Sequence, residues 1–369
     1  MLRSSFLSLV LAATLSSAAT PPEVRLWQTV RGQRIEASLV KAEGDTVVLQ
    51  RKNSKQTLTF TRDDLMPTDT VYLDELAKKQ QQSESPARGS GTSTAIKPFE
   101  PLPVDGSDEV AGEAVKGRLY PRTKDEIRTG LGEILQRDKP KTLDREVHEA
   151  MCRLNAYRFL SGVFNDVGTE PEMVEGAAEA SKACAEAGTI SHSLGHSTDK
   201  CNLSMGHHDI ASTVDGYMND GGDNNRERRG HRRWCLNPPM QNAGFGREGT
   251  FSAMWCMDGG GQRPREPWSY PGRGLYPLDY VQGNAWSFYM PSSLPPDTKV
   301  RIWKLTARPQ QSIPWGEEPK GREISVGFTN VFENTVNFEP DQSILGRRGI
   351  YWVRVHGRGV REQYLTELF

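Results

Sequence analysis

Imidazole and thiol side chains gather in the middle of this chain, between Cys152 and Cys256. Neutral imidazoles and thiolates bind transition metals, and imidazoles also serve as general acids and bases near neutral pH. His196, His207 and His208 fit no zincin-type motif, so we expect them on the surface or packed in loops. Any metal or acid–base site therefore depends on side chains that folding must bring together.

The cysteines add a second kind of chemistry: Cys152, Cys184, Cys201, Cys235 and Cys256. In an oxidising compartment disulfide bridges are the default, and an odd number leaves at least one thiol unpaired or paired with another chain. None of them forms a Cys-x-x-Cys pair, which disfavours a structural zinc site of that kind. Cys201 stands near several histidines, as a Cys–His nucleophile would, but we expect a disulfide or a buried thiol there. The sequence leaves the connectivity open.

Charge and glycine patterns exclude other classes of function. The chain has 46 basic and 47 acidic side chains and a net charge of -1, so we expect no nucleic-acid partner. The glycine run at 258–261 lacks the Gly-Lys-Ser/Thr ending of a phosphate loop and predicts a turn. The arginines at 226–233 could contact anionic lipid or a wall polymer, but we favour a solvated loop paired with Asp220 and Asp223.

Helical periodicity predicts three helices that would position these groups. The first follows Asp144 as its N-cap. The second has Pro171 in its first turn and stops at Gly188, and the third covers 209–219. Short strands and Gly-rich loops follow, with strands predicted at 243–246 and 251–257.

Separated motifs follow one another between residues 140 and 260: Leu-Asn-Ala-Tyr-Arg at 154–158, Ile-Ser-His at 190–192, Asn-Leu-Ser at 202–204, Val-Asp-Gly-Tyr-Met at 214–218, Gly-His-Arg-Arg-Trp-Cys-Leu-Asn-Pro at 230–238 and Ala-Gly-Phe-Gly at 243–246. In order and spacing they resemble the CAP superfamily (SCP/PR-1-like, cysteine-rich secretory). The resemblance implies a domain at 116–264 with an α-β-α sandwich fold. It also implies a central cleft that could hold a small apolar ligand.

The same resemblance implies which residues face that cleft. By motif position, His192 and His231 would be its two histidines, Asp220 an acidic neighbour and Asn202 a further cleft residue. Two neutral imidazoles are suitable ligands for zinc or another divalent transition metal. Where many members have Gly-Glu-Asn, this chain has Lys-Cys-Asn at 200–202, so the cleft loses a carboxylate and gains a thiol.

The segment 24–61 alternates in strand fashion with short turns, and a short helix is predicted around 70–77. Its motifs at 25–27 (Arg-Leu-Trp), 35–37, 47–49 (Val-Val-Leu) and 65–73 resemble the SLA1 homology domain 1 family, an SH3-like small barrel. The resemblance implies a domain at 22–79 that binds a peptide or protein partner. The alternative is that Trp27 and Tyr72 are core aromatics of a spacer domain.

Three further segments complete the organisation. Arg3 and the apolar run at 6–15 predict an export signal at 1–19, and that run is about half as long as a membrane span. We therefore expect no transmembrane segment after cleavage, and a secreted, periplasmic or envelope-associated protein. The polar segment 80–115 predicts a flexible linker. Short, regularly spaced strands at 265–369 predict a β-sandwich.

Together these patterns predict an α+β multidomain fold: a small SH3-like β-barrel, a CAP α-β-α sandwich and a C-terminal β-sandwich. The favoured function is an exported bacterial protein with a binding or scaffold role, through a cleft ligand and a peptide-binding barrel. We assign no catalytic residue. The alternative is a weak metal-assisted hydrolase of peptides or cell-wall material that uses His192 and His231. Both interpretations require these two histidines to meet at one groove.

Overall fold

The structure, a computed structural model, describes residues 24–28, 34–44, 46–52, 54, 56–61, 65, 73, 114–222 and 225–369. The chain divides into two compact units, Met1–Ser93 and Thr94–Phe369. The predicted export signal, the linker up to residue 113 and the helix around 70–77, except Leu73, lie outside the described residues.

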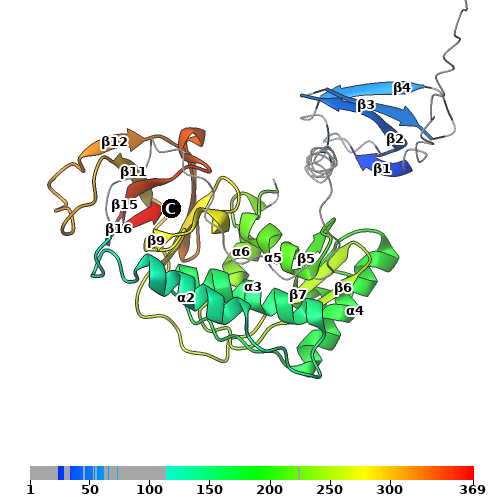
Figure 1. The fold of residues 1–369 in the computed structure, drawn as a ribbon, viewed down its shortest axis with the longest axis horizontal. Coiled ribbons are helices and arrows are strands. Elements are labelled where there is room, and N and C mark those ends of the chain that lie inside the picture. Colours follow the sequence, from blue (N-terminus) through cyan, green and yellow to red (C-terminus); the bar gives the residue numbers. More distant parts are fainter. Residues whose placement is uncertain are drawn as a thin grey trace, which may run out of the picture. The chain divides into compact units, whose positions relative to one another are not determined.

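The first unit is built on one antiparallel sheet with the strand order β1-β2-β3-β4 (Figure 1). The strands are β1 Val24–Gln28, β2 Arg34–Glu43, β3 Thr46–Arg51 and β4 Thr57–Thr61. Because successive side chains of a strand point to opposite faces, alternate side chains of β2 and β3 lie in the core. Trp27 on β1 is fully buried in the same core. The Trp27 indole N–H donates to the carbonyl of Ala37 over 2.9 Å, which satisfies its polar atom inside the core.

Five α-helices lie in the described part of the second unit: α2 Lys124–Leu135, α3 Arg145–Ser161, α4 Pro171–Ala187, α5 Ile210–Asn219 and α6 Gly230–Cys235. The predicted start of α3 and the predicted ends of α4 and α5 are confirmed. Asp144 caps α3 by accepting hydrogen bonds from the N–H groups of Glu146 and Val147. Pro171 is the first residue of α4, and Gly188 ends it in the left-handed conformation at φ 63°.

A three-stranded antiparallel sheet, in the order β5-β7-β6, lies between these helices. Its strands are β5 Cys201–Met205, β6 Gly244–Glu248 and β7 Phe251–Trp255. The helix α4 packs directly on β6, because a Cβ atom at Gly246 would lie only 2.3 Å from the backbone N of Ala178. The helix α5 contacts β5, where the Tyr217 hydroxyl donates to the carbonyl of Asn202 over 2.9 Å.

The C-terminal half holds two larger sheets (Figure 1). One has the order β13-β14-β10-β8, with β8 Trp268–Tyr270, β10 Trp286–Tyr289, β13 Val326–Phe332 and β14 Thr335–Pro340. The other has the order β12-β11-β15-β16-β9, with β9 Gly274–Tyr276, β11 Lys299–Leu305, β12 Gly321–Ile324, β15 Gly349–Gly357 and β16 Val360–Leu368. One buried cluster joins these sheets to α2, α3 and α5.

The predicted fold class is wrong. The described residues form sixteen strands in four sheets, with five α-helices of at most 17 residues, so this part of the chain is mainly β and does not fit a CAP α-β-α sandwich. Local periodicity identified helices α3, α4 and α5 correctly, but it gave no measure of how sheets and helices share a core. The two C-terminal sheets pack into the same core as the helices.

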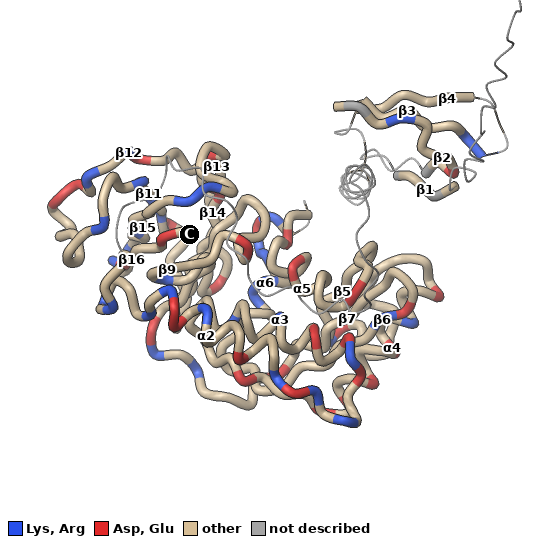
Figure 2. Tube along the Cα trace, viewed as in Figure 1, with Lys and Arg blue, Asp and Glu red and all other residues tan. Residues whose placement is uncertain are grey.

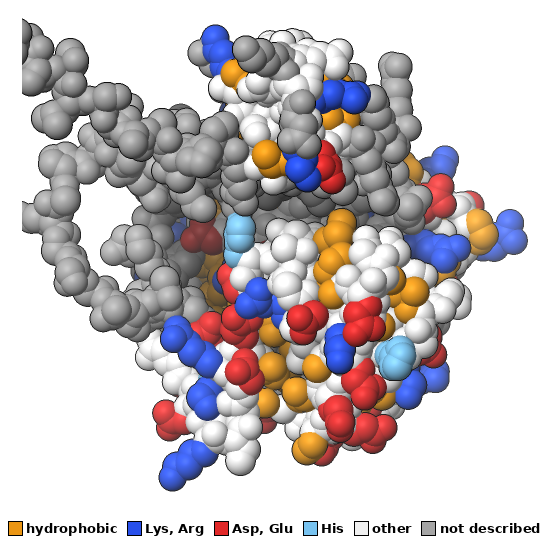
Figure 3. Space-filling model, turned by 90° about the vertical axis from the view of Figure 1, so that its right-hand side faces the viewer, with side chains coloured by type: hydrophobic (Ala, Val, Ile, Leu, Met, Phe, Trp, Pro, Cys, Tyr) orange, Lys and Arg blue, Asp and Glu red, His pale blue; other side chains and the backbone are white. Residues whose placement is uncertain are grey.

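Charged residues are spread along both described units (Figure 2). On the face shown in Figure 3, acidic and basic side chains are interspersed with hydrophobic ones. None of the helices in the described ranges combines the length and the apolar composition needed to cross a bilayer.

Candidate functional site

The side chains of His231 and Asp220 meet where α5 ends and α6 begins. His231 Nδ1 lies 3.0 Å from Asp220 Oδ1, and the carboxylate is fully buried while 20% of the imidazole side chain is exposed. Asp220 Oδ1 has no hydrogen-bond partner of standard geometry in the described residues, so the contact to the imidazole compensates its burial. Because Nδ1 faces the carboxylate, Nε2 is the ring nitrogen left for solvent or a ligand.

The backbone holds this pair in place. Asp220 ends α5 in the left-handed conformation at φ 49°, and Arg229 precedes α6 at φ 45°. Short polar side chains such as aspartate tolerate this region better than most residues do. The turn directs Asp220 Oδ2 to the first N–H groups of α6, where it accepts from His231 N over 2.9 Å and from Arg232 N over 3.3 Å. The carboxylate therefore orients both the imidazole and the helix that carries it.

Asn202 and Tyr217 close the site from the sheet side. The Asn202 side-chain amide donates to the carbonyl of His231 over 3.1 Å, and the Tyr217 hydroxyl donates to the carbonyl of Asn202. The rings of Tyr217 and His231 pack with centroids 5.2 Å apart and an interplanar angle of 52°. Three of the four predicted cleft residues, Asn202, Asp220 and His231, therefore form one connected cluster.

The described hydrogen bonds do not connect His192 to this cluster. It is exposed, and its Nδ1 lies 2.9 Å from the carbonyl oxygen of Thr198 in the loop that leads into β5. Within the described residues it makes no hydrogen bond or ion pair with Asn202, Asp220 or His231. The shared groove predicted for His192 and His231 stays a prediction.

The five cysteines are all buried free thiols, and the structure contains no disulfide among them, in contrast to the expected bridges. Burial raises the pKa of the Cys201 thiol to about 12, and burial also raises the pKa values of Cys235 and Cys256. Cys256 Sγ and Cys235 Sγ lie 3.5 Å and 3.8 Å from the Asn202 amide. Buried thiols with raised pKa values are poor nucleophiles, so these groups act as packing beneath the site.

The basic cluster is tied down by carboxylates and aromatic rings. Arg226 and Arg229 both bind Glu339 on β14, over 2.8 Å and 2.7 Å, and Arg233 pairs with Glu333. The guanidiniums of Arg226, Arg228 and Arg233 lie over the rings of Phe328 and Phe332 on β13. The predicted pairing with Asp220 is replaced by a hydrogen bond from Arg229 to the main-chain oxygen of Asp220, and Asp223 lies outside the described residues.

Motif residues on α3 and α5 meet in a second polar cluster. Arg153 donates to both oxygens of Asp215, over 2.7 Å and 2.9 Å, and the Tyr157 hydroxyl donates to the same carboxylate over 2.6 Å. The Arg153 guanidinium lies 4.6 Å from the ring centroid of Tyr280. These groups satisfy one another, so their part in the motif is to join the two helices.

The described residues do not assemble a complete set of zinc ligands. A zinc ion in a protein takes three or four ligands. Across the part of the chain that the structure describes, no three His, Cys, Asp or Glu side chains group in a way that could hold a metal ion. The predicted zinc or other divalent metal on His192 and His231 stays a prediction.

In the first unit, Trp27 belongs to the core and is unavailable to a partner. Tyr72 lies outside the described residues. Val24 and Val40, on neighbouring strands, are the large hydrophobic side chains that the described part of this unit exposes.

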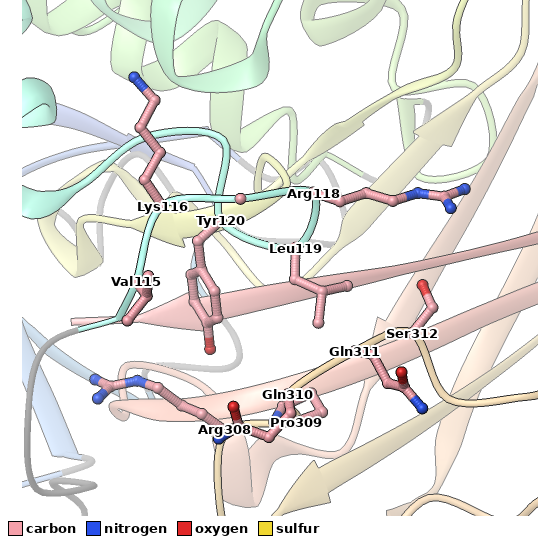
Figure 4. A pocket seen from close by; sticks show the side chains of 11 residues that line it. Val115, Lys116, Arg118, Leu119, Tyr120, Arg308, Pro309, Gln310, Gln311 and Ser312 are labelled. Atoms are coloured by element: carbon pink, nitrogen blue, oxygen red, sulfur yellow. The ribbon is translucent and has the colours of Figure 1, made fainter.

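Sequence reasoning missed a groove of about 680 Å³ in the second unit, lined by residues 115–120 and 308–312 (Figure 4). Its lining comes from two irregular segments far apart in the sequence, so no local sequence motif predicts the groove. Comparison of the chain found no matching family model, curated protein or solved structure. The two family resemblances therefore rest on the motifs alone.

Proposed function

We propose that this chain is an exported protein with a binding role, in which the surface at His231 contacts a small, mainly apolar ligand. The observation that carries the proposal is the partly exposed imidazole held by a fully buried carboxylate. A histidine oriented through Nδ1 presents Nε2 in a fixed direction, where it can accept a hydrogen bond from a ligand or donate one when protonated. Export is supported by the apolar run at 6–15.

Native mass spectrometry of the full chain, secreted from a bacterial host, tests this role. We expect a bound small molecule that is retained by His192→Gln and lost in His231→Gln. The His192→Gln variant is the matched control because both side chains are imidazoles, and the described hydrogen bond of His192 goes to Thr198 and not to the cluster. A bound species that survives His231→Gln would contradict a site at this imidazole.

The first unit is proposed to bind a peptide or protein partner. The support is that Val24 on β1 and Val40 on the neighbouring strand β2 are both exposed large hydrophobic side chains. If these strands carry the interface, Val24→Asp and Val40→Asp will each weaken partner binding, since they place a charge in an apolar contact. Thr59→Asp on β4 is the control, and crosslinking to envelope proteins of the host is the measurement.

A weak hydrolase remains the second candidate, because a carboxylate-oriented histidine is also the arrangement of a general base. Hydrolysis of a chromogenic peptide, with and without added Zn²⁺, separates the two roles. Turnover that disappears in His231→Gln would favour the hydrolase. Ligand retention without turnover would favour binding.

A further inference from the structure

The groove at 115–120 and 308–312 has two walls of irregular chain facing each other (Figure 4). One wall precedes α2, and the other connects β11 to β12. Neither wall is in a helix or a strand, so its main-chain groups are not committed to a ladder. The groove has a volume of about 680 Å³, which fits a ligand of several residues or a drug-sized molecule.

At the floor of the groove, Tyr120 and Arg308 are held by hydrogen bonds to Glu367, and the charges of Arg308 and Glu367 neutralise each other. The Tyr120 hydroxyl donates to Glu367 Oε2 over 2.7 Å, and Arg308 donates to both oxygens of Glu367, over 2.9 Å and 2.7 Å. Glu367 and Tyr120 are buried. The Arg308 guanidinium neutralises the Glu367 carboxylate, so this described pair does not repel an anion.

The walls present hydrogen-bonding groups that the described residues do not use. Arg118, Gln310 and Gln311 are exposed, and none of them makes a hydrogen bond or an ion pair within the described ranges. The Lys116 ammonium forms an ion pair with Glu126, with Nζ 2.5 Å from Oε1. Its side chain points away from the other lining side chains in Figure 4. Among the described residues that line the groove, none is acidic.

Apolar side chains alternate with these polar groups. Val115 is 85% exposed, and Leu119 and Pro309 also line the groove. Tyr120 is the one aromatic residue among the described lining residues, and it is only 4% exposed with its hydroxyl hydrogen-bonded to Glu367. The described lining therefore offers no open aromatic face on which a sugar ring would stack.

We propose that this groove binds an extended acidic peptide segment of a partner protein. A carboxylate of the segment pairs with the Arg118 guanidinium, in the bidentate geometry that arginine favours. The carboxamides of Gln310 and Gln311 supply both donors and acceptors, which match the N–H and C=O groups of a peptide main chain. An apolar side chain of the segment packs on Val115, Leu119 and Pro309. The site is independent of His231 and of the role proposed for it.

Fluorescence anisotropy on the full chain tests this proposal. The probe is a fluorescein-labelled ten-residue peptide of alternating aspartate and leucine. We expect it to bind the wild type, with about tenfold weaker affinity for Arg118→Gln and a several-fold loss in the Gln310→Ala, Gln311→Ala double variant. Arg265→Gln, an exposed arginine outside the groove, is the matched control and should bind as the wild type does. A peptide with asparagine in place of aspartate should bind at least tenfold more weakly.

Two results would overturn the proposal. One is equal affinity of Arg118→Gln and wild type, or of the acidic and neutral peptides. The other concerns the chain's own residues 100–113, which contain acidic but no basic side chains. If replacing those acids by their amides raises the probe affinity about tenfold, the groove belongs to that segment and not to a partner. Unchanged affinity would support a partner in trans.

Discussion

His231 and Asp220 are joined twice, through the imidazole Nδ1, 3.0 Å from one carboxylate oxygen, and through the main-chain N–H, 2.9 Å from the other. One buried side chain therefore sets both the orientation of the ring and the start of α6. A histidine whose ring and backbone are held by the same carboxylate cannot turn independently of its helix. This coupling makes Asp220 a positioning residue whose loss affects stability as well as binding.

Asp220→Ala should lower the free energy of unfolding by about 2–3 kcal/mol, because it leaves the N–H groups of His231 and Arg232 without their charged acceptor. Urea denaturation followed by circular dichroism measures the change. Asp199→Ala is the control, since Asp199 is exposed and makes no described hydrogen bond, and it should shift the value by less than about 0.5 kcal/mol. Equal effects of the two substitutions would show that the cap is not formed.

The state of the five cysteines can be counted directly. We expect none of the thiols to react with a thiol-specific reagent at pH 8 in the folded protein, because all five are buried. All five should react after denaturation without a reducing agent. Fewer than five would reveal disulfides and restore the bridging expected from an oxidising compartment.

Alkaline pH should destabilise the protein through these thiols. Burial raises the folded-state pKa of Cys201 to about 12, whereas an unfolded thiol titrates near its ordinary pKa of 9.0. The folded state thus keeps a proton that the unfolded state loses, so this stabilisation is complete below about pH 9 and disappears as pH rises towards 12. Between pH 9 and pH 12 the free energy of unfolding of the wild type should fall by about 1.4 kcal/mol per pH unit more than that of Cys201→Ala. If the free energies of unfolding of the two proteins changed in parallel with pH, this prediction would be wrong.

The sequence predicted local features better than their assembly. Asp144, Pro171 and Gly188 mark helix ends through capping and backbone preference, which depend on near neighbours. The cluster of Asn202, Asp220 and His231 was found only through motif order, since no spacing rule connects them. The groove and the shared core depend on contacts such as Tyr120 with Glu367, which are 247 positions apart. Such pairings leave no periodic signal, and the fold-class error has the same origin.

Arg232 has a structural role that the sequence analysis, which treated it as part of a solvated basic cluster, did not predict. It is fully buried, and its guanidinium donates to the carbonyls of Met218, Asn219 and Ala285 and to the Ser287 hydroxyl. It thereby ties the end of α5 to β10. Arg232→Lys should lower the free energy of unfolding by about 2–4 kcal/mol, because an ammonium cannot reproduce the hydrogen bonds of the planar guanidinium.

The matched control is Arg233→Lys on the same helix. Its guanidinium pairs with the exposed Glu333, and exposed pairs contribute about 1 kcal/mol or less. Thermal unfolding of both variants measures the difference. A loss for Arg233→Lys as large as that for Arg232→Lys would mean that the buried hydrogen bonds contribute little.

Gly246→Ala tests how α4 and the three-stranded sheet are held together. The added Cβ would lie 2.3 Å from the N and 2.4 Å from the Cα of Ala178, so the helix must move away from β6. Both clashing atoms belong to the backbone, and a rotamer change cannot relieve them. Overpacking of this kind costs about 1–3 kcal/mol or more. Gly259→Ala, which has open space and no positive φ, should be neutral in the same unfolding assay. If Gly246→Ala were also neutral, the close approach of α4 to β6 would be wrong, and with it the packing that supports β5 and Asn202 under His231.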